Sequence, residues 1–292
     1  MSTDSQHPKK KRINQSTETK EMACVRYLDG EDGATIAKSM GVGKTDIYKW
    51  LRSHSILPRS NSESNRHTPI NDSAFSTITE ESAYWAGFFM ADGCLIDSHM
   101  GKAIKKFEMG LASVDVNHLV KLSKFIRPEH TPIFRHQRHI NPSGSIGSHV
   151  TIAFNSEKIF DDLVNLGITP RKSYTAKASE CICMNRDFWR GVIDGDGSVY
   201  WSKNNPDYYA PTICLIGSHN LMNQFSSFIF HHFPDTRKPS VIAQRNISRV
   251  RVTGKRASQL ANILYGNSTI YLDRKHKSAM EMIAEAGKPR LH

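Results

Sequence analysis

The sequence predicts an α+β fold in which two tandem αββαββα repeats follow a small all-α domain. Three observations predict it: a ten-residue segment occurs twice, the same order of elements follows each copy, and a polar stretch with helical patterning precedes both. A unit repeated at a long fixed period indicates internal duplication. The two repeats are therefore expected to form a pseudo-twofold molecule.

The repeated segment occupies residues 84–93 and 188–197. Both copies carry an aromatic residue, a Trp and a Gly at matching positions before a final Asp-Gly, and Asp196 follows Asp92 by 104 residues. Each copy is apolar for about two helical turns and ends in Gly, the usual residue just beyond a helix C-terminus. Each copy is therefore expected to form a helix.

Small residues lie four positions apart within each predicted helix, at Gly87 and Ala91 and at Gly191 and Gly195. Residues at that spacing share one helical face. Glycine inside a helix costs about 1 kcal/mol relative to alanine, whereas a face of small residues lets two backbones approach closely. The two motif helices are therefore expected to pack against each other through these faces.

Such packing would bring Asp92 and Asp196 together at the C-terminal ends of the two helices. The helix dipole is negative there, and two neighbouring carboxylates repel each other. A divalent cation, Mg²⁺ or Mn²⁺, would relieve both effects because it takes hard oxygen ligands. An ordinary Asp-Gly turn is the alternative, but the matched repetition favours metal binding. The backbone of residue 91 is assigned no metal-binding role.

Composition limits the class of protein. The 292 residues include 39 Lys plus Arg and 28 Asp plus Glu, a net charge of +11, which favours a polyanionic partner. No apolar run approaches a membrane span, and the polar N-terminus lacks a secretory signal. Five scattered cysteines favour reduced thiols and an intracellular protein, cytoplasmic if bacterial or from a phage. Cys181 and Cys183 lack a second pair at zinc-ligand spacing and are expected in a strand or in the core.

The N-terminal part divides into three segments. Residues 1–18 are expected to be a disordered basic tail, whose run at residues 8–12 suits a nuclear import signal, a phosphate-binding arm or a solvated tail. Residues 19–56 carry three helical patterns with a glycine-containing turn before the third, the order of a helix-turn-helix domain. Residues 57–77 are rich in Ser, Asn, Thr and Pro and are expected to be a flexible linker.

The segment at residues 19–56 resembles the small DNA-binding domains of resolvases and transposases. In such domains the third helix enters the major groove. That makes four residues candidate DNA contacts: Lys44, Thr45, Tyr48 and Lys49. A three-helix bundle that binds nothing is the alternative.

The two repeats are expected at residues 78–180 and 181–285. After the first motif, the patterns predict strands near 94–97, 105–111, 131–139 and 148–154 and helices near 115–126 and 156–166. After the second, they predict strands near 198–202, 211–216, 239–244 and 248–253 and helices near 219–231 and 256–265.

The two motifs and the repeat order resemble the LAGLIDADG homing endonucleases, in the single-chain form with two motifs, over about residues 78–285. The resemblance implies that the motif helices join the two halves and that each half presents a curved antiparallel sheet to the DNA major groove. It further implies a monomeric, site-specific double-strand DNA endonuclease. Asp92 and Asp196 match the acidic residues that bind divalent metal where both strands are cut.

The resemblance also implies one basic residue in each half, in the loop after the helix that follows the fourth strand. The segments 167–173 and 271–275 match that region, so Lys172 and Lys275 are candidate catalytic residues. They would stabilise developing charge or position solvent. Plain surface lysines are the alternative.

Two positions depart from the family pattern. Met90 stands where the family often has an acid, which Asp194 keeps and which is structural in the family. Arg190 replaces a small residue and is expected either to tilt the helix packing or to face solvent.

Polar residues of the predicted strands are candidates to contact base edges or phosphates. In the second repeat, Arg249 and Arg251 would share one face of a strand. The full set is Arg135, Gln137, Arg138, Gln244, Arg245, Arg249 and Arg251. A solvated sheet face is the alternative.

A second function stays open at this stage. Some relatives act as RNA splicing maturases, with intron RNA as partner, or as DNA-binding regulators that do not cut. Retention of both Asp92 and Asp196 disfavours a degenerate regulator. Maturase activity is compatible with cleavage.

Overall fold

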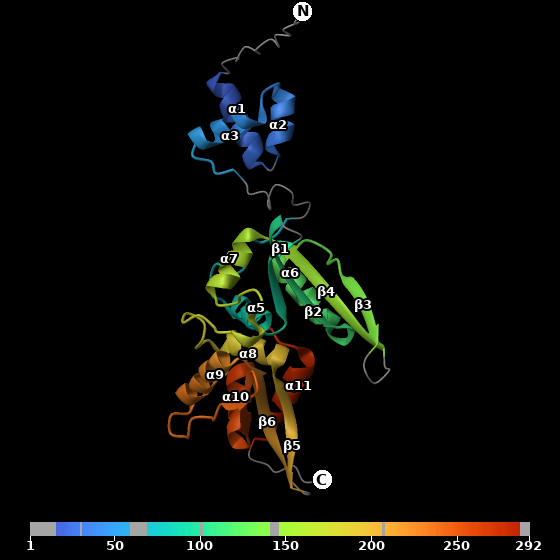
Figure 1. Ribbon diagram of the computed structural model, residues 1–292, viewed down its shortest axis with the longest axis vertical. Coiled ribbons are helices and arrows are strands. Elements are labelled where there is room, and N and C mark those ends of the chain that lie inside the picture. The colour runs from blue at the N-terminus through green and yellow to red at the C-terminus, as the bar shows by residue number, and fades with distance from the viewer. Residues whose placement is uncertain are drawn as a thin grey trace, which may run out of the picture. The chain divides into compact units, whose positions relative to one another are not determined.

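The computed structural model describes residues 16–29, 31–58, 69–99, 102–140, 146–205 and 208–286 (Figure 1). The chain divides into two compact units, residues 1–67 and 68–292, each with its own buried core. The basic run at residues 8–12 lies outside the described residues. Within those residues, no helix is both long and apolar enough to cross a membrane.

The first unit contains the three predicted helices, α1 (Thr17–Leu28), α2 (Gly33–Met40) and α3 (Lys44–Ser53). Local sequence sets their ends. At the start of α2, the side chain of Asp32 accepts hydrogen bonds from two backbone N–H groups. At its end, Gly41 adopts the left-handed conformation, which costs glycine no strain. Small and apolar residues from all three helices form one core.

The second unit contains the two repeats. The first comprises α5 (Glu80–Ala91), β1 (Gly93–His99), β2 (Lys102–Ala112), α6 (Val116–Ile126), β3 (Arg135–Ile140), β4 (Ile146–Asn155) and α7 (Glu157–Asn165). The second comprises α8 (Arg186–Asp196), β5 (Ser198–Asn205), β6 (Tyr208–Gly217), α9 (His219–His232), β7 (Ile242–Gln244), β8 (Ile247–Thr253) and α10 (Lys255–Tyr265). The predicted α+β class and the αββαββα order are confirmed.

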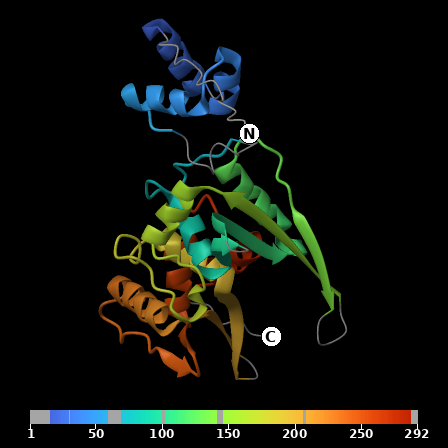
Figure 2. The same cartoon turned by 45° about the horizontal axis from the view of Figure 1, so that its top comes forward.

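Each repeat forms one four-stranded antiparallel sheet, in the order β1-β2-β4-β3 or β5-β6-β8-β7. Alternating residues are buried along the central strands, and the register places Phe107 opposite Phe154 and Met109 opposite Ile152. Helices pack against the face that carries these side chains, as Figures 1 and 2 show. Because successive side chains of a strand point to opposite faces, polar side chains occupy the other face of each sheet.

The seam between the repeats is the packing of α5 against α8. A Cβ added to Gly87 would lie 1.9 Å from the carbonyl oxygen of Phe188, and one added to Gly191 would lie 2.0 Å from that of Tyr84. These contacts are reciprocal, because the 104-residue offset relates Gly87 to Gly191 and Tyr84 to Phe188. The predicted close approach through small residues is therefore confirmed, and it occurs about a pseudo-twofold axis.

The predicted linker at residues 57–77 is wrong in its second half. Residues 69–77 pack onto the first repeat, where the ring of Phe75 is 4% exposed and meets the ring of Phe89 edge-on. Residues 59–68 lie outside the described residues. The segment is polar in composition, so the sequence did not indicate that one aromatic residue, Phe75, would anchor it to the first repeat.

Two predicted strands are shorter than expected. The strand expected at 131–139 begins at Arg135, and the one expected at 239–244 begins at Ile242. Each lost part contains a proline, Pro132 or Pro239, which has no N–H to donate to a neighbouring strand.

Cys181 and Cys183 lie in no strand and neither is fully buried, although Cys183 packs against the core. They occupy the turn before α8, where Cys181 is exposed and Cys183 is partly buried. The apolar character of the segment comes from Ile182 instead, which is fully buried between them.

Among the described residues, one α-helix was not predicted, α11 (Asp273–Ala284). Its buried face consists of Lys275, Ala279 and Met282, at the i, i+4, i+7 spacing of a helix. A lysine occupies the first of these core-facing positions, so hydrophobicity alone does not reveal the pattern.

Replacing Gly87 or Gly191 by alanine is expected to destabilise the fold by about 3 kcal/mol, because the added Cβ must separate two backbones. Urea unfolding followed by circular dichroism measures the loss. Gly217→Ala is the control, since its Cβ would meet only the flexible ends of Met222 and Leu221, at 3.2 and 3.5 Å. Similar small losses at all three positions would contradict the packing of the seam.

Candidate metal-binding site at the helix seam

Asp92 and Asp196 lie where the last turns of α5 and α8 meet. Asp92 caps α5, and Asp196 is the last residue of α8. A Cβ added to Gly195 would lie 2.3 Å from Cβ of Ala91 and 3.2 Å from Oδ2 of Asp92. The carboxylate of Asp92 therefore lies beside the stretch of backbone that carries Asp196, as the sequence predicted.

The surroundings of the two carboxylates disfavour negative charge. Both residues keep exposed surface, yet the surrounding protein displaces enough water to raise the pKa of Asp92 to about 6 and that of Asp196 above its usual value. The charge of Asp196 raises the pKa of Asp92 further. The nearby Lys172 and Lys275 act in the opposite direction on both. Added positive charge near the pair would therefore favour the ionised form of both carboxylates.

Lys172 and Lys275 lie beneath the carboxylates and are only 8% and 6% exposed. Each donates to the carbonyl oxygen of the glycine after one aspartate, Lys172 to Gly93 and Lys275 to Gly197. Lys275 also donates to the carbonyl oxygens of Ile193, Asp194 and Gly195, at 2.7, 2.7 and 3.0 Å. Burial lowers the pKa of Lys275 to about 8 and lowers that of Lys172 as well. Neither residue is a plain surface lysine.

Asp194 is buried, and its carboxylate accepts three hydrogen bonds. Its Oδ1 accepts from the hydroxyl of Tyr265 at 2.7 Å, and its Oδ2 accepts from the hydroxyl of Tyr84 and the backbone N–H of Leu272, at 2.8 and 2.7 Å. Because Tyr84 belongs to α5, this carboxylate joins the two repeats. The structural role implied by the resemblance agrees with these contacts.

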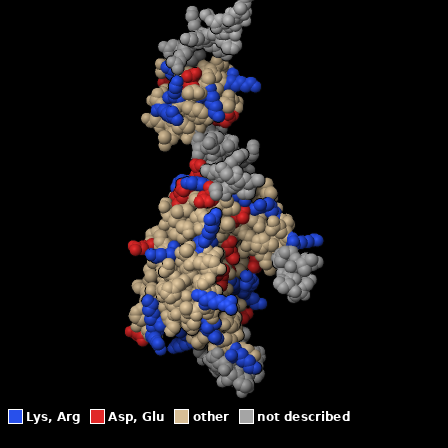
Figure 3. Space-filling view, viewed as in Figure 1, with Lys and Arg blue, Asp and Glu red and all other residues tan. Residues whose placement is uncertain are grey.

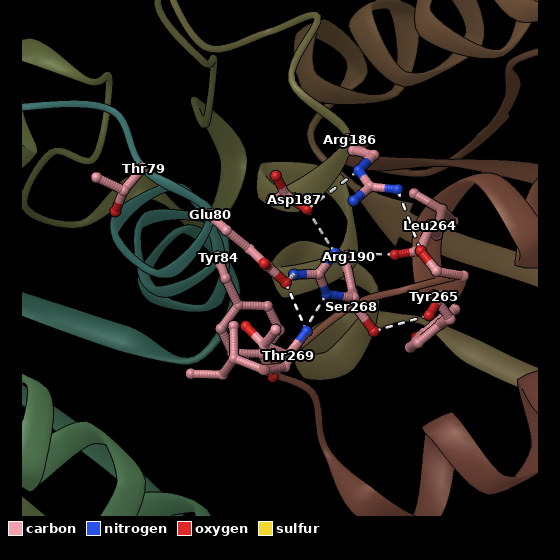
Figure 4. Close-up of polar contacts among 12 residues, drawn as sticks. Thr79, Glu80, Tyr84, Arg186, Asp187, Arg190, Leu264, Tyr265, Ser268 and Thr269 are labelled. Carbon is pink, nitrogen blue, oxygen red and sulfur yellow. Dashed lines mark hydrogen bonds and ion pairs between the residues drawn. The ribbon is translucent and has the colours of Figure 1, made fainter.

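Arg190 is fully buried and does not face solvent, contrary to one of the two expectations for it. Figure 4 shows its guanidinium between α5 and the chain after α10. It forms ion pairs with Asp187 at 2.6 Å and Glu80 at 2.9 Å. An arginine is stable at this depth only because these partners compensate its charge.

The strand residues predicted to contact DNA do not all lie on the same face of their sheets. On β8, Val250 and Val252 are buried while Arg249 and Arg251 lie on the open face, as expected. On β3, Arg135 is opposite Thr151 and Gln137 is opposite His149, both on the open face of their sheet. Gln244 of β7 is opposite Ile247 and shares the face of Arg249.

Two of these candidates do not lie on the open face of a strand. Arg138 is opposite Ser148, in the same alternation as the buried Val150, and therefore points to the helix-covered side of the sheet. Arg245 lies in the turn between β7 and β8 with a positive φ of 52°. Arg135, Gln137 and Arg138 therefore do not form one surface.

Sequence reasoning missed Glu108, which forms ion pairs with Lys106 at 2.7 Å and Arg135 at 2.9 Å. The contact with Arg135 crosses over an intervening strand, so no local sequence signal could have revealed it. Within the described parts of the chain, Arg249 and Arg251 form no ion pair. On the face shown in Figure 3, basic side chains are scattered among acidic ones and form no continuous patch.

The donor set suits a hard cation. Asp92 and Asp196 offer carboxylate oxygens, which Mg²⁺ and Mn²⁺ prefer, and added positive charge would offset the repulsion there. Among the described residues, no group of three or more His, Cys, Asp or Glu gathers into a complete metal cage. Water or a bound phosphate would have to complete the coordination, which is the usual arrangement for Mg²⁺.

Comparison with known proteins finds similar solved structures only. No protein-family model and no curated protein matches the chain. Among solved structures, it is similar to the LAGLIDADG meganuclease I-AabMI bound to uncleaved DNA, with 12% identity over 72% of this chain and 90% of that one and a TM-score of 0.47. It is also similar to I-SmaMI bound to an uncleaved DNA target with calcium ions, with 13% identity over 72% and 91% and a TM-score of 0.47.

Millimolar Mg²⁺ is expected to raise the melting temperature of the chain, because a cation held by native Asp92 and Asp196 favours the folded state. Asp92→Asn should lose most of this shift, while Asp161→Asn, at an exposed ion pair with Lys105, should keep it. Scanning calorimetry with Mg²⁺ or EDTA measures both. A full shift in the Asp92 variant would contradict the site.

Without metal at about pH 8, Asp92→Asn is expected to melt at or above the temperature of the wild type. The pKa of Asp92 is raised in the fold to about 6, so the stability gained by protonation is present below the ordinary pKa and lost as the pH rises through about 6. Calorimetry in EDTA at pH 5 and pH 8 measures the difference. A variant that is less stable than the wild type only at pH 8 would contradict this charge repulsion.

Proposed function

We propose that the chain is a site-specific double-strand DNA endonuclease that uses a divalent cation held by Asp92 and Asp196. One observation carries the proposal: two aspartates lie at the adjoining ends of reciprocally packed helices, and a buried lysine binds the carbonyl oxygen of the glycine after each. The pseudo-twofold relation between them suits a duplex, whose two strands present equivalent phosphates about a twofold axis. Because one chain supplies both halves, a monomer suffices.

Hydrolysis of a phosphodiester needs an activated water and a stabilised leaving oxygen, and a bound divalent cation supplies both effects. Asp92 and Asp196 would hold that cation and orient it toward the phosphate. Lys172 and Lys275 would add positive charge at fixed positions, because each is anchored to backbone carbonyls. Preorganised charge of this kind stabilises a transition state without reorganisation.

The open faces of the two sheets are the proposed DNA-binding surface. Arg249 and Arg251 support it in the second repeat, since they lie on that face without acidic partners among the described residues. Gln137 and Gln244 occupy open positions on the edge strands and would suit hydrogen bonds to base edges. Arg135 would first have to leave Glu108, so its contribution is expected to be smaller.

The first unit is proposed as a second DNA contact. Lys44, Thr45 and Lys49 are exposed on α3 and Tyr48 is partly so, whereas Ile47 and Leu51 are buried on the opposite side. Positions 44, 45, 48 and 49 share one helical face. A polar, basic face on the third helix is what insertion into the major groove requires.

Asp92→Asn and Asp196→Asn are each expected to reduce cleavage by at least about a thousandfold while DNA binding persists, because the cation loses one of its two protein ligands. Cleavage of a randomised DNA library with Mg²⁺, read by sequencing of the ends, measures the loss. Asp161→Asn is the matched control. Cutting that survives both changes would refute the proposed roles. Binding without cutting by the wild type would instead favour the regulator or maturase alternative.

Lys44→Ala and Lys49→Ala are each expected to weaken binding to the selected DNA and to lower the slope of log affinity against log salt by about 1, because each removes one phosphate contact. Fluorescence anisotropy over a salt series measures the slope. Lys20→Ala on α1 is the control for general charge. Equal slopes for all three variants and the wild type would remove the first unit from the DNA interface.

A further inference from the structure

The two halves of the seam are not chemically equivalent. The 104-residue offset relates Ala86 of α5 to Arg190 of α8 and Met90 to Asp194. All four side chains are buried, so two apolar positions in the first repeat correspond to two ionisable positions in the second. Buried charges are costly unless they are paired and hydrogen-bonded, which indicates that the second repeat uses them for a specific purpose.

Arg190 directs its guanidinium at the connection between α10 and α11 (Figure 4). Its Nε donates to the carbonyl oxygen of Ile270 at 2.8 Å, and its Nη1 donates to that of Leu264 at 2.9 Å. The group also lies over the ring of Tyr84, 5.3 Å from its centre. The planar fork of an arginine can fix two backbone carbonyls at once, which a lysine cannot do in the same way.

Glu80 and Asp194 hold the same connection at other points. The Oε1 of Glu80, which pairs with Arg190, also accepts from the backbone N–H of Thr269 at 2.7 Å. The Oδ2 of Asp194 accepts from the backbone N–H of Leu272 at 2.7 Å. Residues 264–272 are therefore fastened to the two motif helices through both carbonyl and N–H groups.

This connection determines where Lys275 lies. Leu272 is the N-cap of α11, and its carbonyl oxygen accepts from the backbone N–H of Lys275 at 3.0 Å. The side chain of Lys275 then reaches back to the four carbonyl oxygens at the end of α8. In the first repeat the matching motif positions are Ala86 and Met90, whose side chains offer no hydrogen bond to the segment that carries Lys172.

We propose that Arg190 is a positioning residue for Lys275, which it holds under the second carboxylate by fixing residues 264–272 against the motif helices. The half of the centre built around Asp196 then depends on a buried guanidinium, and the half built around Asp92 does not. The placement of Lys275 follows from the contacts alone. Its effect on strand cleavage rests on the proposed function.

The test compares the accessibility of two lysines in one protein. Wild type, Arg190→Met and the control Arg186→Met are acetylated briefly under native conditions, and peptide mass spectrometry gives the rate at each lysine. Arg186 is a neighbour in the same network, but its side chain is 41% exposed and donates to the carbonyl oxygens of Ile263 and Gly266, at the C-terminal end of α10 and not at Ile270 or Leu272 next to α11.

In Arg190→Met, the acetylation rate of Lys275 is expected to rise about tenfold while that of Lys172 stays constant, since the anchoring hydrogen bonds are lost in one half only. Arg186→Met should change neither rate. If the methionine variant does not fold, Arg190→Lys replaces it, because it keeps a charge for Glu80 and Asp187 without the fork for the two carbonyls. An unchanged rate at Lys275, or an equal rise at Lys172, would overturn the proposal.

Cleavage supplies the second readout. With DNA selected by the wild type, Arg190→Met is expected to slow the cutting of one strand about tenfold relative to the other and to accumulate nicked duplex, with DNA affinity unchanged. Equal slowing of both strands would show that Arg190 acts on the whole fold. A wild-type chain that cuts no DNA refutes the nuclease proposal, while the acetylation result still decides the positioning of Lys275.

Discussion

The contact on which the structure depends is the approach of α5 and α8 at Gly87 and Gly191. Each glycine lies against a backbone carbonyl of the other helix at a distance that no side chain could occupy. This contact fixes the pseudo-twofold axis between the repeats. It also fixes the ends of both helices, and with them the separation of Asp92 and Asp196. A seam formed by larger residues would move the carboxylates apart and leave neither in a position to share a cation.

The two halves reach similar geometry by different chemistry. Both lysines bond to the carbonyl after the motif aspartate, Lys172 at Gly93 and Lys275 at Gly197. The first half is packed with apolar side chains, whereas the second contains Arg190 and Asp194 with compensating partners. The two repeats share a backbone arrangement, and they differ in the side chains at the seam. Buried polar networks fix a specific arrangement more strongly than apolar packing does, so the second half is expected to be the more rigid one.

Much of the fold could be predicted because its signals are local and repeated. The spacing of Gly87, Ala91 and their counterparts indicates the seam, and the alternation along β8 indicates which arginines face outward. The position of both aspartates followed from the first of these patterns. The roles of Asp92, Asp196 and the two lysines in catalysis stay predictions.

The sequence-based predictions fail for residues whose surroundings are formed by distant parts of the chain. Phe75 joined the core because a ring in the first repeat lies within reach, which the polar composition around it did not indicate. Lys275 takes a core position of a helix because the carbonyl groups at the end of α8 satisfy it. Arg190 is buried because Glu80, 110 residues earlier, supplies the opposite charge. Arg138 is the exception, because the alternation of the strand already places it on the face opposite Arg135 and Gln137.

The most direct test of the central claim is anomalous diffraction from crystals of this chain soaked in Mn²⁺. The shared-cation account predicts an anomalous peak between α5 and α8, with a carboxylate oxygen of Asp92 and one of Asp196 each about 2.1 Å from a bound ion. Mn²⁺ found only elsewhere, or carboxylates that remain apart with no ion at the seam, would contradict it.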